Sequence, residues 1–123
     1  MSVTPTPTEI KLHQKSRMLE IAFNDGSNFN FPCEFLRVHS PSAEVRGHGP
    51  GQETLQLDKE EVNITTIEQV GNYAIKPTFS DGHATGIFSF EELYNLGLRQ
   101  DALWQEYLSQ LKAAGHERKT INH

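Results

Sequence analysis

The sequence predicts a single α+β domain, built from a small, mostly antiparallel β-sheet of about five to seven strands and a main C-terminal helix. Three observations predict this fold. Apolar and polar residues alternate through residues 10–31 and again through residues 62–88, which is the period of strands. Two Asp-Gly pairs, at Asp25 and Asp81, interrupt these stretches with the chemistry of tight hairpins. After Ser89 the apolar period becomes that of a helix, and the 123 residues suit one core.

The first three strands are predicted from alternating apolar residues, which lie at Ile10 and Leu12, then at Leu19, Ile21 and Phe23, and then at Phe29 and Phe31. Residues 24–27, Asn-Asp-Gly-Ser, form the turn before the third strand, because Asp-Gly tolerates the positive φ of a tight hairpin. Pro32 ends the third strand, since proline has no N–H for the ladder. Residues 33–37 then predict a short helical turn.

The second half of the chain continues with further strands. Alternating leucines predict a short strand over residues 53–58, and β-branched residues predict another over residues 62–67. Residues 73–79 lead into a turn at residues 80–83, and Ile87 and Phe88 lie on the returning strand.

Helices follow these strands. Ser89 and Glu92 have the spacing of a capping box, which marks a helix N-terminus. Gly97 is predicted to break or kink the apolar stripe that follows, giving a short helix and then a longer one over residues 100–113. Gly115 is predicted at the C-terminal cap of the longer helix.

An internal echo runs through the chain. The sequence Phe23-Asn-Asp-Gly precedes Phe31-x-x-Glu-x-Leu, and Phe79-Ser-Asp-Gly precedes Phe88-x-x-Glu-x-Leu. Both stretches read as a strand, an Asp-Gly hairpin, a strand and a helical turn. Two interpretations account for the echo: a structural pseudo-repeat, or the chance similarity of common hairpins.

The composition of the chain predicts its domain limits and argues against several classes of protein. Residues 1–8 are predicted as a flexible Pro/Thr-rich lead, 9–113 as the single domain and 114–123 as a polar tail. A net charge of −5 and a pI of about 5.6 argue against nucleic-acid binding. The lone cysteine, Cys33, excludes an intrachain disulfide framework. Because the sequence has neither a secretory signal nor an apolar run of roughly 20 residues, we expect a cytoplasmic protein without a membrane span.

The segment from residue 37 to residue 52 is the candidate site. After Leu36 its only sizeable apolar side chains are Val38 and Val45, so it is poorly suited to build a core. Its interleaved His, Arg and Glu residues are unlike a generic linker, and binding residues concentrate on loops of this kind. The predicted partner-binding residues are Arg37, His39, Ser40, Ser42, Glu44, Arg46 and His48.

Metal binding is a second interpretation. His39, His48 and His83 are ligands of the type that zinc and iron accept, although the sequence fixes no cofactor. The alternative is that these histidines are solvated loop and turn residues. No Gly-x-Ser-x-Gly elbow is present, and the glycine-rich stretch 47–51 lacks the Lys-Ser/Thr pair of a nucleotide-binding loop. No catalytic residue is therefore predicted, and we expect a protein that is not an enzyme.

Three motifs together resemble a known family. The resemblance lies in Leu36-Arg37-x-x-Ser40-Pro41-Ser42-Ala43-Glu44-Val45, in Gly47-His48-Gly49-Pro50-Gly51-Gln52, and in Tyr73-Ala74-Ile75-x-x-x-Phe79-x-Asp81-Gly82-His83-x-x-Gly86-Ile87-Phe88-Ser89. The chain is similar over about residues 9–112 to the domain of unknown function 971 family, also called the gamma-butyrobetaine hydroxylase-like N-terminal domain. The resemblance implies a module that precedes the barrel of gamma-butyrobetaine and trimethyllysine dioxygenases. It also implies a module that accompanies iron–sulfur carrier ATPases, and one that stands alone in many bacteria.

The resemblance also implies a zinc site in the dioxygenase members, held by three cysteines and one histidine. The cysteine positions correspond to Ser40, Ser42 and Val45 here, and the histidine corresponds to His83. Serine is a poor zinc ligand and valine is none, so one ligand of four is retained. The chain also lacks the dioxygenase barrel, so the resemblance implies no dioxygenase activity for it.

These observations predict a non-catalytic accessory or interaction module. The resemblance implies a protein partner such as an iron–sulfur carrier ATPase or another metalloprotein. The alternative is a small zinc- or iron-binding protein that uses histidines near residues 37–52 and the turn at His83.

Overall fold

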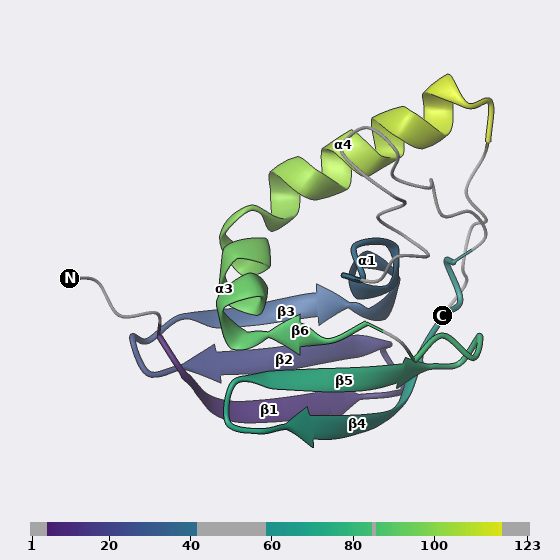
Figure 1. Ribbon diagram of the computed structural model, residues 1–123. Coiled ribbons are helices and arrows are strands. Elements are labelled where there is room, and N and C mark those ends of the chain that lie inside the picture. Colours follow the sequence, from purple (N-terminus) through teal and green to yellow (C-terminus); the bar gives the residue numbers. More distant parts are fainter. Residues whose placement is uncertain (1–4, 42–58, 85, 117–123) are drawn as a thin grey trace.

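The computed structural model describes residues 5–41, 59–84 and 86–116, and its helices lie together on one side of the strands (Figure 1). The elements, in chain order, are β1 (Pro7–His13), β2 (Met18–Phe23), β3 (Asn28–Pro32), α1 (Cys33–Val38), β4 (Ile64–Val70), β5 (Ala74–Phe79), β6 (Phe88–Ser89), α3 (Phe90–Leu98) and α4 (Gln100–Ala113). The predicted α+β class is confirmed. The strand predicted over residues 53–58 lies outside the described residues, and β1 begins inside the predicted lead 1–8.

The described strands form two sheets, and the prediction of a single sheet was wrong. One antiparallel sheet has the order β1-β2-β3 and the other the order β4-β5-β6. Alternation in a sequence identifies a strand and its buried face, but it contains no information about which strand pairs with which. The two sheets share one hydrophobic core, to which α1 and α3 also contribute.

The two hairpin turns have the same geometry. In the first, the N–H of Phe23 donates to Ser27, and Gly26 has a φ of 91°. In the second, the N–H of Phe79 donates to His83, and Gly82 also has a φ of 91°. Only glycine adopts this left-handed conformation without strain, which explains both Asp-Gly pairs.

The echo in the sequence is a structural repeat. We call residues 7–38 (β1, β2, β3 and α1) the first unit and residues 64–98 (β4, β5, β6 and α3) the second unit. Both units have an irregular pairing near their start, between Pro7 and Glu9 in β1 and between Ile64 and Thr66 in β4. In both, the first helical residue donates its N–H to the residue before the middle strand: Cys33 to Arg17 and Phe90 to Tyr73. The pseudo-repeat interpretation is confirmed.

The carboxylates of the two turns reach the helix of the other unit. Asp25 in the first turn accepts a 2.6 Å hydrogen bond from the hydroxyl of Tyr94 in α3. Asp81 in the second turn accepts a 2.9 Å hydrogen bond from Nε of Arg37 in α1. Arg37 and Tyr94 each follow the leucine of the repeated Phe-x-x-Glu-x-Leu motif, so the two contacts are equivalent.

Two close approaches at glycine are also reciprocal. A Cβ on Gly97 of the second unit would lie 2.5 Å from the ring of Phe29 in the first unit. A Cβ on Gly86 of the second unit would meet Oγ of Ser40, just beyond α1 of the first unit. Ser40 and Gly97 occupy equivalent places in the repeat, as do Phe29 and Gly86, so each contact mirrors the other.

The helices match the sequence prediction closely. Ser89 caps α3, because its Oγ accepts the N–H of Glu92 at 3.0 Å. Gly97 does not break this helix; α3 continues to Leu98, and the missing side chain makes room for an aromatic ring. Gly115, with a φ of 75°, follows α4 as predicted. No helix in the described ranges is both long and apolar enough to cross a membrane.

The helices pack in two hydrophobic clusters. Most of the core lies between the sheets, α1 and α3. A smaller cluster joins α4 to the end of α1 through Val38, Tyr107 and Leu111. The end of α1 is therefore held from two sides, and this is where the candidate site begins.

Candidate functional site

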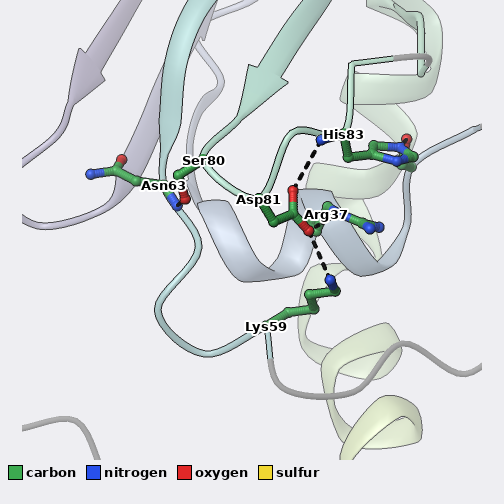
Figure 2. A network of polar contacts seen from close by, with 7 residues as sticks. Arg37, Lys59, Asn63, Ser80, Asp81 and His83 are labelled. Carbon is green, nitrogen blue, oxygen red and sulfur yellow. Dashed lines mark hydrogen bonds and ion pairs between the residues drawn. The ribbon is translucent and has the colours of Figure 1, made fainter.

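The second hairpin turn meets the end of α1 and the chain that enters β4 (Figure 2). We call the residues that meet there the polar cluster: Arg37, Ser40, Lys59, Asp81 and His83. Three chain segments that are distant in sequence contribute to it.

Asp81 is the centre of the polar cluster. Its Oδ2 accepts hydrogen bonds from Nε of Arg37 at 2.9 Å and from Nζ of Lys59 at 2.7 Å, and its Oδ1 accepts the N–H of His83 at 3.2 Å (Figure 2). Burial alone would raise the pKa of Asp81. The hydrogen bonds from Lys59 and the His83 backbone, with the charge of Arg37, outweigh burial and lower the pKa to about 2. Asp81 is therefore ionised at neutral pH.

Ser40 and His83 form a buried pair beside this carboxylate. Oγ of Ser40 lies 3.0 Å from Nε2 of His83, and both side chains are buried. These are two of the positions at which the resemblance implies zinc ligands. Here the ring nitrogen is engaged by a hydroxyl, which is a poor zinc ligand, and Gly86 packs closely against the same hydroxyl. This pair does not fit the implied zinc site.

The metal ligands predicted from sequence are not brought together among the described residues. His83 lies in the polar cluster, whereas Nδ1 of His39 donates to the carbonyl of Phe35 at 3.0 Å and its ring packs on the Phe35 ring. Burial lowers the pKa of His39. Within residues 5–41, 59–84 and 86–116, no three His, Cys, Asp or Glu side chains are grouped as metal ligands. Ser42, Glu44, Val45, Arg46 and His48 lie outside the described residues.

Arg37, one of the predicted partner-binding residues, is buried at the end of α1. Its side chain is only 8% exposed and is paired with Asp81, so it supports the structure rather than presenting a free guanidinium. Lys59 and Asp81 are members of the cluster that sequence reasoning missed. The signal for Asp81 was the repeat itself, because Asp25 occupies the same place in the first turn.

Asn63 joins the second turn to the first unit. Its N–H donates to Oγ of Ser80, and its side-chain amide donates to the carbonyl of Gln14 at 2.9 Å. Its Oδ1 accepts from the N–H of Ile64 and lies 3.7 Å from Sγ of Cys33. Burial raises the pKa of the Cys33 thiol to about 11, which disfavours the thiolate form at neutral pH.

The described chain is thus a small α+β domain of two similar sheet-and-helix units, with a partly buried polar cluster between them. It belongs to the gamma-butyrobetaine hydroxylase-like, N-terminal family, whose model matches residues 10–94.

Solved structures agree with this membership. One protein solved by NMR in solution is 47% identical, covers 100% of this chain and 96% of its own, and superposes with a TM-score of 0.81. A second NMR structure is 41% identical, covers 98% and 95% of the two chains, and has a TM-score of 0.82. A crystal structure from Acidithiobacillus ferrooxidans, of a protein of unknown function in the DUF971 family, is 36% identical over 75% and 92% of the chains, with a TM-score of 0.64. No curated protein matches the chain.

Proposed function

We propose that this protein is a non-catalytic interaction module for a metalloprotein, with an iron–sulfur carrier ATPase as the first candidate partner. Its recognition residues are His39, Ser42, Glu44, Arg46 and His48. Arg37 and Ser40, which the sequence placed among the contact residues, are buried, so the proposal does not assign them direct contacts with the partner.

The observation that carries this proposal is the position of Asp81. One carboxylate binds Arg37, which precedes residues 42–58, and Lys59, which follows them. A segment with the composition of a binding loop is thereby anchored at both flanks to a folded body. Recognition segments are commonly presented in this way, on a scaffold that provides rigidity but no chemistry.

Binding to a purified iron–sulfur carrier ATPase from the same organism tests the proposal. A Glu44→Ala/Arg46→Ala/His48→Ala variant should bind at least about tenfold more weakly than the wild type, or about 1.4 kcal/mol. The matched control is Glu9→Ala/Lys11→Ala, because this pair is exposed on β1. The control should bind like the wild type, and both variants should keep the wild-type circular dichroism spectrum and melting temperature. Equal weakening by the control, or no binding of this ATPase by the wild type, would overturn the proposal for this partner.

The metal-binding alternative is supported by one observation. A carbonyl can only accept, so Nδ1 of His39 carries the proton and Nε2 is the nitrogen with the lone pair, as in many histidines that bind metals. Elemental analysis of untagged protein, with melting curves in the presence and absence of a chelator, tests this function. Stoichiometric zinc or iron and a melting temperature lowered by the chelator would establish it. Metal-free protein with an unchanged melting temperature would exclude it.

A further inference from the structure

The two turns differ in what their carboxylates bind. Asp25 binds the neutral hydroxyl of Tyr94 at a site open to solvent. Asp81, its counterpart, binds two cations, and the side chains of Arg37, Lys59 and Asp81 are 8%, 21% and 26% exposed. Since the first turn shows that one neutral contact can join a turn to the opposite helix, the second cation at Asp81 calls for an explanation of its own.

The second cation at Asp81 is Lys59, which lies in the chain that leads into the second unit. Arg37 already provides the equivalent of the Tyr94 contact, because it lies at the same place in its helix. Lys59 precedes β4 and has its Nζ on the same carboxylate oxygen. One oxygen atom therefore fixes the backbone before residue 42 and the backbone after residue 58.

The hydrogen bond between Ser40 and His83 reinforces the first of these two flanks. It ties the last part of the chain before residue 42 to the same turn, at 3.0 Å and away from solvent. Two independent contacts thus hold the chain on the N-terminal side, and the Lys59 ion pair holds it on the C-terminal side.

We propose that Asp81 is an electrostatic clasp, which holds the chain before residue 42 and the chain after residue 58 together by binding Arg37 and Lys59 at once. The clasp works through charge, and it needs no metal ion. Its neutral counterpart at Asp25 joins the two units but closes no segment. This inference rests on the same Asp81 contacts as the proposed function, but it is tested by hydrogen exchange of the isolated protein, so its failure can be told apart from a failure to bind the partner.

Hydrogen exchange of the isolated protein tests the clasp. In Asp81→Asn, the amide of Ser40, which donates to Arg37, and the amide of Val62, which donates to Lys59, should both exchange at least about tenfold faster. Amides of β2 that exchange through global unfolding should speed up only by the factor that the loss of global stability sets. The matched control, Asp25→Asn, should leave the amides of Ser40 and Val62 unchanged.

A second variant separates the two flanks. In Lys59→Gln, exchange should rise at Val62 and stay unchanged at Ser40, and the double variant with Asp81→Asn should exchange no faster than Asp81→Asn alone. In the wild type, raising the salt from about 0.05 M to about 1 M should speed exchange at Val62, because screening weakens the partly exposed ion pair.

Three results would overturn the clasp. One is unchanged exchange at Ser40 and Val62 in Asp81→Asn, which would mean that the Asp81 contacts do not hold the two flanks. Another is an effect at only one flank. The third is an additive effect of the two substitutions. If Asp81→Asn does not fold, the Lys59→Gln variant and the salt series decide the question, and unchanged exchange at Val62 in both would exclude the clasp.

Discussion

The two units have the same order of strands and helix, an irregular pairing at the same place and the same turn geometry, yet they differ in the chemistry that joins them. The first turn is held by a tyrosine hydroxyl on Asp25, at the surface. The second turn is held by Arg37 and Lys59 on Asp81, in a setting that is mostly buried. Since burying charge is costly unless it is paired, the second contact is the more demanding way to make the same connection. Equivalent places in a repeat can therefore hold contacts of very different cost, and the costlier contact is the one that involves a third segment of the chain, at Lys59.

Replacing each carboxylate in turn should show the largest difference in stability between the two turns. Asp81→Asn should lower the free energy of unfolding by about 3 kcal/mol, because it leaves the buried Arg37 without this partner. Asp25→Asn should cost clearly less, because its contact is exposed. Urea denaturation at pH 7 measures both. Equal losses for the two variants would mean that the turns are energetically alike.

Acid should remove the stabilising effect of the Asp81 carboxylate in the second turn. The pKa of Asp81 is lowered to about 2 in the folded protein, from an ordinary value near 3.8. A lowered folded-state pKa contributes stability that is complete above the unfolded value and is lost as the pH falls through the folded value. Between about pH 4 and about pH 2 the wild type should therefore lose about 2 kcal/mol more than Asp81→Asn. Urea midpoints over this range measure the difference, and parallel curves for the two proteins would contradict it.

The reciprocal glycine contacts allow a steric test. Alanine usually stabilises a helix relative to glycine, but Gly97→Ala should destabilise this protein by about 1–3 kcal/mol, because its Cβ would collide with the Phe29 ring. Adding Phe29→Leu should recover part of the loss in thermal melts. If Gly97→Ala instead raises the melting temperature, the ring must be able to move aside.

The hydrogen bond between Ser40 and His83 should have the smallest effect. Ser40→Ala removes one buried hydrogen bond and should cost about 1 kcal/mol. The melting temperatures of the wild type and of this variant should both be insensitive to a chelator, since the contact does not depend on a metal. A chelator effect that is present in the wild type and lost in Ser40→Ala would show that this hydroxyl belongs to a metal site.

Local periodicity was enough to predict most elements of the fold. The strands around Leu19 and Phe79, the cap at Ser89 and the long final helix follow from alternation, turn chemistry and capping. The division into two sheets was missed, because the pairing of strands is decided by tertiary packing. The similarity of the two Asp-Gly turns could be seen in the repeated sequence motifs. Only the hydrogen bonds show that the similarity extends to the contacts between the two units.

The site was predicted less completely. Ser40 and His83 were singled out, and the structure brings them together. Arg37 was predicted as a partner-binding residue because it lies in the segment 37–52, and its burial involves Asp81, which is distant in sequence. The sequence around Lys59 did not indicate a buried contact, because a lysine beside a run of acidic residues is usually expected to be exposed to solvent. Long-range ion pairs of this kind become visible only when the chain is folded.

The crossed contacts of the two turns have the form of an isologous interface, such as that of a symmetric dimer, contained within one polypeptide. In a dimer of identical chains, every substitution appears at both copies of a contact. When the two partners are fused, one copy can keep a tyrosine while the other acquires an arginine and a lysine. Fusion also makes the association independent of protein concentration. The covalent link therefore allows this small protein to be symmetric in architecture and asymmetric in chemistry.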